Sequence, residues 1–226
     1  GEDIISIHEE YLKAGADIIN TNTFGANSLK YTGKDGVPSL DAIIRVAVGN
    51  VKEAIKRTGK DDAYVCLDIG PSGKLLEPFG DFPFEDAIEL FAKVVRAGVD
   101  CKVDLILIET MNDSYETKAA VLAAKENSNL PVFVTNVYDE NEKLMTGADP
   151  ATMVAMLEGL RVDAVGMNCS LGPGQMKEFV SDFINAASIP VIVNPNAGMP
   201  RLVDGETIYD IGPDEFAKHM VDIVKS

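Results

Sequence analysis

The stretch FEDAIELFAKVVRAGVDCKVDLILIETMNDSYETKAAVLAAKE, residues 84–126, decides the fold. Apolar side chains recur at helical spacing from about residue 84 to residue 97, and VDLILIE (103–109) is then a short run that is apolar on both faces. A second helical stretch follows from about residue 114 to residue 126. A strand that is apolar on both faces and lies between helices is typical of a parallel sheet covered by helices. The stretch therefore predicts an α/β fold.

The same alternation runs through the rest of the chain. Further strands are predicted at 16–20, 63–69, 131–136, 163–168 and 190–195, and further helices at about 4–12, 39–56, 151–160, 174–187 and 213–224. The prediction is thus six strands and seven helices. Each strand runs into a loop that contains glycine or polar residues. Ligands of parallel α/β proteins bind at the carboxyl ends of the strands, so these loops are expected to carry the chemistry.

An open doubly wound sheet and a closed barrel both fit this order of elements. The loop after the first strand, NTNTFGAN (20–27), lacks the G-x-G-x-x-G fingerprint of a dinucleotide-binding open sheet, which favours the barrel. A full (β/α)8 barrel takes about 250 residues, whereas this sequence has 226 and both starts and stops on a predicted helix. We therefore expect one domain over residues 1–226, an incomplete (β/α)8 TIM barrel that lacks its first strand and its last strand-helix unit.

Composition excludes several classes of protein. A hydrophobic share of 46% is sufficient for a continuous core, and 36 acidic against 20 basic side chains give a net charge of -16. This charge disfavours nucleic acid and anionic membrane surfaces as partners. No apolar run reaches the roughly 18 residues of a membrane span, and no signal-peptide pattern opens the sequence, so a cytoplasmic location is expected. Three cysteines without a C-x-x-C pair make a disulfide framework improbable.

Two motifs have simple structural interpretations. GPSGKLL (70–76) does not have the spacing of a phosphate-binding P-loop, and Gly70 and Gly73 are expected to shape a tight turn where the backbone passes close to a ligand or a neighbouring strand. His8 and His219 lie on predicted helices far from any strand end. We expect them at the surface or between helices rather than as ligands.

Polar residues at the strand ends are the candidates for function. Glu109 closes the apolar strand LILIE, where an unpaired carboxylate would be costly to bury, so it should have a cationic or hydrogen-bonded partner. It either caps a neighbouring loop or recognises a substrate ammonium group. The same rim carries a further set of polar residues, which are Thr21, Asn22, Thr23, Thr135 and Asn136.

Cys169 is the most informative single residue. It follows the strand DAVGMN (163–168) and precedes a glycine-rich turn, SLGPG, whose backbone N-H groups could face a ligand. A free cysteine is most often an inert buried thiol, and for Cys169 this interpretation stays open beside a functional one. Cys66 lies in the middle of a predicted strand and is expected in the core, while Cys101 is expected to be incidental.

With these motifs in place, the sequence resembles the homocysteine S-methyltransferase family, most closely the homocysteine-binding module of cobalamin-dependent methionine synthases. The matching segments are AGADIINTNTFGAN (14–27), DIGPSGKLLEPFG (68–80), DLILIETMND (104–113), LMTGADP (144–150), DAVGMNCSLGP (163–173), NPNAGMP (194–200) and YDIGPDEFAKH (209–219). They follow the family's order and cover nearly the whole chain.

The resemblance implies a (β/α)8 barrel that transfers a methyl group to homocysteine and yields methionine. In the family, three cysteine thiolates hold a zinc ion that binds and activates the homocysteine sulfur. Cys169 matches the first of these ligands, and Asn196 matches a position that offers the metal an oxygen when substrate is away. Glu109 would accept the homocysteine ammonium group, backbone N-H groups near Ser170 would hold its carboxylate, and Thr23 belongs to the same substrate-binding group. No residue of this chain is implied as a catalytic acid or base.

The resemblance also implies partners and marks departures. The methyl donor would be methylcobalamin carried on another module, with a folate-binding module as a further partner. The family's opening DGAMGT-like segment and its GGCCGT motif, which holds the other two zinc cysteines, are absent, and the segment around Cys101 is longer than the family's AGVDLILIE.

These departures keep other interpretations open. One thiolate does not make a catalytic zinc site, so this polypeptide alone is expected to be zinc-poor. One alternative is a truncated, metal-free and inactive fragment or scaffold of the same barrel. Another is a different barrel enzyme, such as a pterin-binding methyltransferase, in which homocysteine would not perturb Cys169. A barrel that lacks strands would also expose sheet edges, which makes self-association an expectation.

Overall fold

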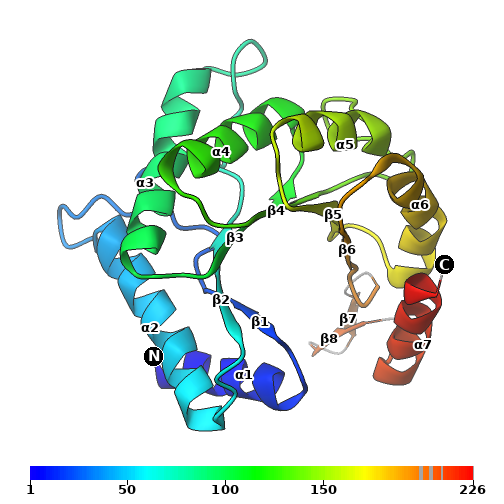
Figure 1. The fold of residues 1–226 in the computed structure, drawn as a ribbon, viewed down its shortest axis with the longest axis horizontal. Coiled ribbons are helices and arrows are strands. Elements are labelled where there is room, and N and C mark those ends of the chain that lie inside the picture. The colour runs from blue at the N-terminus through cyan, green and yellow to red at the C-terminus, as the bar shows by residue number, and fades with distance from the viewer. Residues whose placement is uncertain (199–200, 204–205, 210, 226) are drawn as a thin grey trace. The chain divides into compact units, whose positions relative to one another are not determined.

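The computed structural model describes residues 1–198, 201–203, 206–209 and 211–225. Helices and strands alternate along the chain, as Figure 1 shows. The helices are α1 (Glu2–Lys13), α2 (Leu40–Thr58), α3 (Phe84–Asp100), α4 (Ser114–Asn127), α5 (Pro150–Gly159), α6 (Pro173–Ala186) and α7 (Pro213–Val224). The strands are β1 (Ile18–Asn20), β2 (Tyr64–Ile69), β3 (Leu105–Met111), β4 (Val132–Asn136), β5 (Ala164–Asn168), β6 (Val191–Asn194), β7 (Arg201–Val203) and β8 (Glu206–Ile208).

The strands β1 to β6 form one sheet in sequence order, β1-β2-β3-β4-β5-β6. The pairs β1-β2, β2-β3 and β5-β6 are parallel, and in the β2-β3 pair Asp68 lies beside Leu107. This order confirms the predicted parallel α/β class with six strands and seven helices in the described part of the chain. Two further strands, β7 and β8, form a separate antiparallel pair.

The chain divides into two compact units. Unit 1 comprises residues 1–109 and 115–133, and unit 2 comprises residues 110–114 and 134–226. The division passes through β3 and β4, so that each unit contains part of both strands.

Unit 1 packs α1, α2 and α3 beside its strands, and Figure 1 shows α2 and α3 outside β2. The α2 helix begins where the hydroxyl of Ser39 accepts a hydrogen bond from the N-H of Ala42, and it ends at Gly59, which adopts a left-handed φ of 68°. Gly98 of α3 allows close packing, since a Cβ there would lie 2.5 Å from the side chain of Leu67 on β2. Leu67 therefore points toward α3, and the residues on either side of it in β2 point away from that helix.

Unit 2 is built on β5 and β6 with α5, α6 and α7. Gly166 on β5 is required by the approach of β6, because a Cβ there would lie 1.8 Å from the carbonyl oxygen of Ile192. The α5 helix begins at Asp149, whose carboxylate accepts a hydrogen bond from the N-H of Thr152, and continues with Pro150 at its first position.

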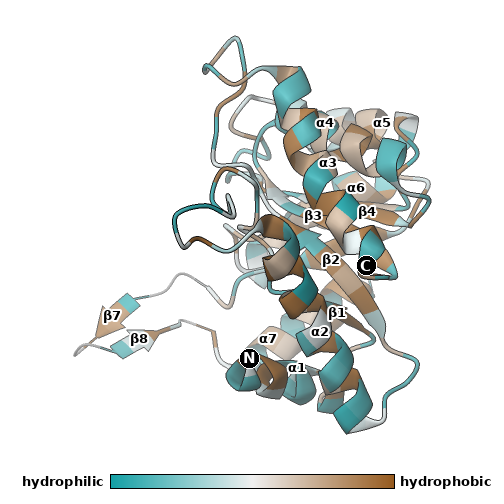
Figure 2. Ribbon diagram, turned by 90° about the vertical axis from the view of Figure 1, so that its left-hand side faces the viewer, coloured by the Kyte–Doolittle hydropathy of each residue, from teal (hydrophilic) through white to brown (hydrophobic). Residues whose placement is uncertain are grey.

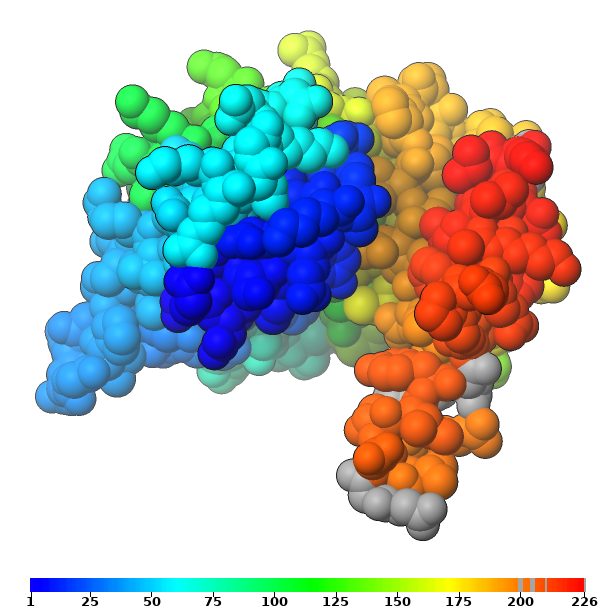
Figure 3. Space-filling model, turned by 90° about the horizontal axis from the view of Figure 1, so that it is seen from below, coloured from blue at the N-terminus to red at the C-terminus, as the bar shows by residue number. Residues whose placement is uncertain are grey.

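The hairpin formed by β7 and β8 was not predicted from the sequence. Its side chains are exposed, including Leu202 at 76% and Tyr209 just after it at 56%. Figures 2 and 3 show it extending away from the other elements of unit 2.

Most of the predicted boundaries agree with the structure to within three residues. The main difference in the sheet concerns β3, which continues beyond Glu109 to Met111. Within the described residues, no helix combines the length and the apolar character that crossing a membrane would require.

Candidate functional site

In unit 1, two carboxyl groups lie on the same face of neighbouring strands. Asp68 of β2 pairs in register with Leu107 of β3, and Glu109 follows two residues later on the same face of β3. Because Leu67 points toward α3, this shared face is the one turned away from the helix. The Cys66 thiol, two residues before Asp68, shares the face and is buried, as predicted for a core residue.

Burial gives this carboxyl pair unusual protonation behaviour. Asp68 is 6% exposed, and one of its carboxyl oxygens has no hydrogen-bond partner in the described part of the chain. Desolvation, with the nearby charge of Glu109, raises the pKa of Asp68 to about 8. Desolvation also raises the pKa of Glu109, although its hydrogen bond with Asp68 acts in the opposite direction. Burial therefore disfavours the charged form of both carboxyl groups, and the Asp68 carboxyl is mostly protonated at neutral pH.

Two threonines fix the backbone of Asp68. The hydroxyl of Thr23 donates to the carbonyl oxygen of Asp68 at 2.7 Å, and the hydroxyl oxygen of Thr21 accepts from the N-H of Asp68 at 3.1 Å. The two hydroxyls are 2.7 Å apart, so Thr21 donates to Thr23. Both threonines are almost fully buried. The predicted substrate-binding residue Thr23 thus contacts Asp68 directly.

The turn after β2 is held from two sides. A Cβ on Gly70 would lie 2.5 Å from the ring of Phe24, which confirms that this glycine permits a close approach of two backbone segments. On the other side, one carboxylate oxygen of Glu116 accepts hydrogen bonds from the N-H of Ser72 at 2.8 Å and from its hydroxyl at 2.5 Å. Gly73 has a φ of 80°, as expected for the predicted tight turn.

In unit 2, Cys169 follows β5 directly and lies beside the end of β3. The side chain of Asn168 donates to the Cys169 sulfur at 3.4 Å and to the Thr110 hydroxyl at 2.7 Å, and accepts from the Thr110 N-H at 3.0 Å. Thr110, Cys169 and Ser170 have φ values of 62°, 58° and 51°. Such left-handed backbone costs about 1–3 kcal/mol for each residue that is not glycine, and it is concentrated at functional sites.

The loop after Cys169 brings the other predicted residues of unit 2 together. The N-H of Cys169 donates to the carbonyl oxygen of Asn194 at 3.1 Å, and the N-H of Asn196 donates to the carbonyl oxygen of Leu171 at 3.0 Å. Asn196 is therefore adjacent to the Cys169 loop. The hydroxyl of Ser170 donates to the carbonyl oxygen of Tyr138 at 2.7 Å, which anchors the exposed turn.

The remaining polar residues of the rim differ in their surroundings. Asn136 is buried and donates to the carbonyl oxygen of Met111 at 3.1 Å. The hydroxyl of Thr135 is buried without a partner in the described residues, and Asn22 is exposed. The histidines are helical, as predicted: His8 is buried on α1, and His219 lies on α7 at 3.8 Å from Glu215.

A three-thiolate zinc site is not formed by the residues that the structure describes. Among them, no group of three His, Cys, Asp or Glu side chains is arranged to hold a metal ion. Cys169 with the neighbouring Asn196 offers one thiolate and one amide oxygen, which is fewer than the three protein ligands of a typical catalytic zinc site. These residues alone do not fit the metal.

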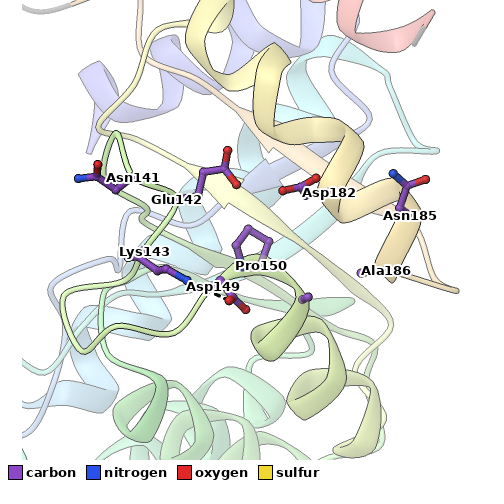
Figure 4. Close-up of a pocket in the computed structure, with 9 residues that line it drawn as sticks. Asn141, Glu142, Lys143, Asp149, Pro150, Asp182, Asn185 and Ala186 are labelled. Carbon is purple, nitrogen blue, oxygen red and sulfur yellow. Dashed lines mark hydrogen bonds and ion pairs between the residues drawn. The ribbon is translucent and has the colours of Figure 1, made fainter.

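A hollow of about 410 Å³ lies elsewhere on unit 2, lined by the loop after β4, α5 and α6 (Figure 4). Lys143 and Asp149 form an ion pair across 2.9 Å, while the carboxylate of Glu142 faces that of Asp182. Slight burial, and then a hydrogen bond with Asp182 and its charge, raise the pKa of Glu142. None of the predicted site residues lines this hollow, and we assign it no role.

Comparisons with known proteins show which family the chain is similar to. A family model described as homocysteine S-methyltransferase matches residues 2–226. Methionine synthases of Mycobacterium leprae and Mycobacterium tuberculosis are 31% and 29% identical to the chain over 97% of its length. The chain spans 19% of the length of each of these relatives.

Solved structures show the same fold. The homocysteine methyltransferase MmuM from Escherichia coli matches in its metallated form with a TM-score of 0.75 and 21% identity, and in its apo form with 0.71 and 22%. Each match covers 86% of this chain and 72% of the other. The parallel strands and these matches thus place the chain in the TIM-barrel class of α/β folds. The chain belongs to the homocysteine S-methyltransferase family, whose members methylate homocysteine.

Two residues of the site were missed in the sequence. Asp68 interrupts the apolar strand YVCLDI just as Glu109 closes LILIE, and this interruption was the signal that could have found it. Asn168 is the last residue of the strand DAVGMN before Cys169, and the sequence gives it no role of its own. Its bonds join residues that are 58 positions apart, and no local pattern reveals them.

Proposed function

We propose that residues 1–226 form a single homocysteine-binding domain of a cobalamin-dependent methionine synthase. In this proposal a methyl group passes to the sulfur of homocysteine and yields methionine. Family membership over the whole chain and the similarity to mycobacterial methionine synthases support it.

The observation that carries the proposal is the carboxyl pair of Asp68 and Glu109. An amino-acid substrate carries an ammonium group, and a buried carboxyl pair with an unpartnered oxygen is a suitable acceptor for it. Glu109 would accept the ammonium group directly. Thr23 would contribute through its hydrogen bond to Asp68, which holds that residue in position.

The substrate carboxylate would be bound at the turn after Cys169. In the described part of the chain, no acceptor receives the backbone N-H of Ser170, and the Ser170 side chain is already held by Tyr138. A free N-H in an anchored, exposed turn can donate to a carboxylate without reorganisation. We therefore assign the carboxylate to the backbone of this turn rather than to the hydroxyl of Ser170.

Cys169 and Asn196 are the proposed contributions of this chain to a zinc site. Since they do not complete such a site among the described residues, the other ligands would have to be supplied from elsewhere, for example by a second copy of the chain or by another module. The methyl donor would be methylcobalamin on another module, with a folate-binding module as a further partner and the cytoplasm as the location. Self-association of this polypeptide through exposed sheet edges also remains a proposal.

The test is the zinc content of the purified chain, with and without homocysteine, beside Cys169→Ser and a Cys101→Ser control. About one zinc per chain that is lost only in Cys169→Ser would show that the missing ligands are supplied, for example by a second copy. Zinc near zero in all samples would favour the alternative, a metal-free fragment or scaffold whose activity depends on the longer protein. Zinc that is retained in Cys169→Ser would contradict the assigned ligand.

A further inference from the structure

We infer that Asn168 is a positioning residue of the proposed site: its side-chain amide holds the sulfur of Cys169 and the peptide of Thr110 in one fixed arrangement. This inference rests on the proposed function, because only that function gives the orientation of the Cys169 sulfur a role. Its structural basis is independent of any bound metal or substrate.

The hydrogen bonds of Asn168 use both ends of its amide. The Thr110 N-H can only donate, and it points at the Asn168 Oδ1 at 3.0 Å, so the orientation of the amide is unambiguous. Nδ2 must then face the Thr110 Oγ1 at 2.7 Å and the Cys169 Sγ at 3.4 Å. Asn168 is 3% exposed, so water does not compete for these contacts.

The two contacts with Thr110 explain how its backbone is maintained. A β-branched residue with a φ of 62° is an outlier that persists only where the surroundings hold it. Asn168 binds both the N-H and the hydroxyl of Thr110, which is the residue bonded directly to Glu109 in the sequence. The amide therefore fixes the end of β3 at the position that follows the proposed ammonium acceptor.

The contact with Cys169 has a different character. Sulfur accepts only weakly from an N-H group, so this contact contributes direction more than strength. The Thr110 hydroxyl lies 4.0 Å from the same sulfur. The two contacts hold the sulfur against the end of β3 and so fix its orientation.

Alkylation of the intact chain by iodoacetamide tests this role, with the rate at Cys169 measured by mass spectrometry and the rate at Cys101 as the internal reference. We expect Asn168→Ala to slow the reaction at Cys169 about ten-fold relative to Cys101, because the sulfur is no longer held in one orientation. Asn168→Asp should slow it to a similar extent, because a carboxylate keeps the shape of the side chain but has no N-H to direct at the sulfur.

The double variant Asn168→Ala with Thr110→Gly separates positioning from folding. Glycine adopts a positive φ without strain, so this variant should recover the thermal stability that Asn168→Ala loses while alkylation of Cys169 stays slow. Unchanged alkylation in Asn168→Ala, or full recovery of the rate in the double variant, would overturn the inference. Slow alkylation in a protein that fails to bind homocysteine would leave the positioning role intact and reject the proposed function instead.

Discussion

Asp68 is a carboxyl group that folding removes from water next to a second carboxyl group. Its backbone is held by Thr21 and Thr23, and its burial raises its pKa to about 8. Proteins keep such groups where a cation or a proton is part of their function, since leaving both carboxylates charged would be costly. At the scale of single residues, this pair is the strongest sign of a substrate-binding role in unit 1.

The raised pKa of Asp68 predicts how stability depends on pH. Between the ordinary pKa of 3.8 and the raised value of about 8, the folded chain binds more protons than the unfolded chain, so the free energy of unfolding falls as pH rises. Asp68→Asn removes this titration and keeps the shape of the side chain. The free energy of unfolding should fall between about pH 5 and pH 8 in the wild type, and we expect this fall to be smaller in Asp68→Asn by about 3–4 kcal/mol. Urea unfolding at both pH values measures this difference. An equal fall in unfolding free energy in the wild type and in Asp68→Asn would contradict the raised pKa of Asp68.

The sequence predicted the position of Glu109 but not its partner. A cation or a hydrogen-bonding group was expected, and the partner is the carboxyl group of Asp68, which becomes a hydrogen-bonding group when it is protonated. The register of β2 against β3 places both carboxyl groups on one face. Sequence periodicity does not specify the register between two strands, so this pairing could be seen only in the structure.

At the scale of elements, alternation of helices and strands was predictable because each of the strands β1 to β6 is a short, largely apolar run between amphipathic helical stretches. The end of β3 was not predictable, because the continuation of this strand through Thr110 to Met111 depends on hydrogen bonds with the side chain of Asn168. The hairpin of β7 and β8 was missed although RLVDGETI (201–208) contains the Asp-Gly dipeptide that favours tight hairpins. Its strands have only three residues each, which is too short for a clear alternation.

Replacing Gly70 and Gly49 by alanine should change the free energy of unfolding in opposite directions. At Gly70, a Cβ would meet the ring and carbonyl oxygen of Phe24 at 2.5 and 2.7 Å, so Gly70→Ala should lower the free energy of unfolding by about 1–3 kcal/mol. Gly49 lies in α2 with nothing within 4 Å of its Cβ position, so Gly49→Ala should raise it by about 0.5–1 kcal/mol. Denaturant unfolding of both variants measures the difference. A Gly70→Ala protein as stable as the wild type would show that the Phe24 loop can move away.

At the scale of the whole molecule, the fold class was predictable and the division into two units was not. Parallel pairing and sequential strand order follow from strands that are apolar on both faces and alternate with helices. The boundary between the units falls inside β3 and β4, where no linker or change of composition marks it. The net charge of -16 argues against nucleic acid as a partner but does not identify the substrate.

A calorimetric titration of the chain with homocysteine, beside Glu109→Gln and a Glu126→Gln control at an exposed position of α4, tests most directly whether this domain binds homocysteine through Glu109. We expect one homocysteine to bind per chain. Glu109→Gln should weaken this binding at least about ten-fold, because a charged hydrogen bond to the ammonium group is lost, and Glu126→Gln should leave it unchanged. Absence of binding, or equal affinity in wild type and Glu109→Gln, would contradict these expectations.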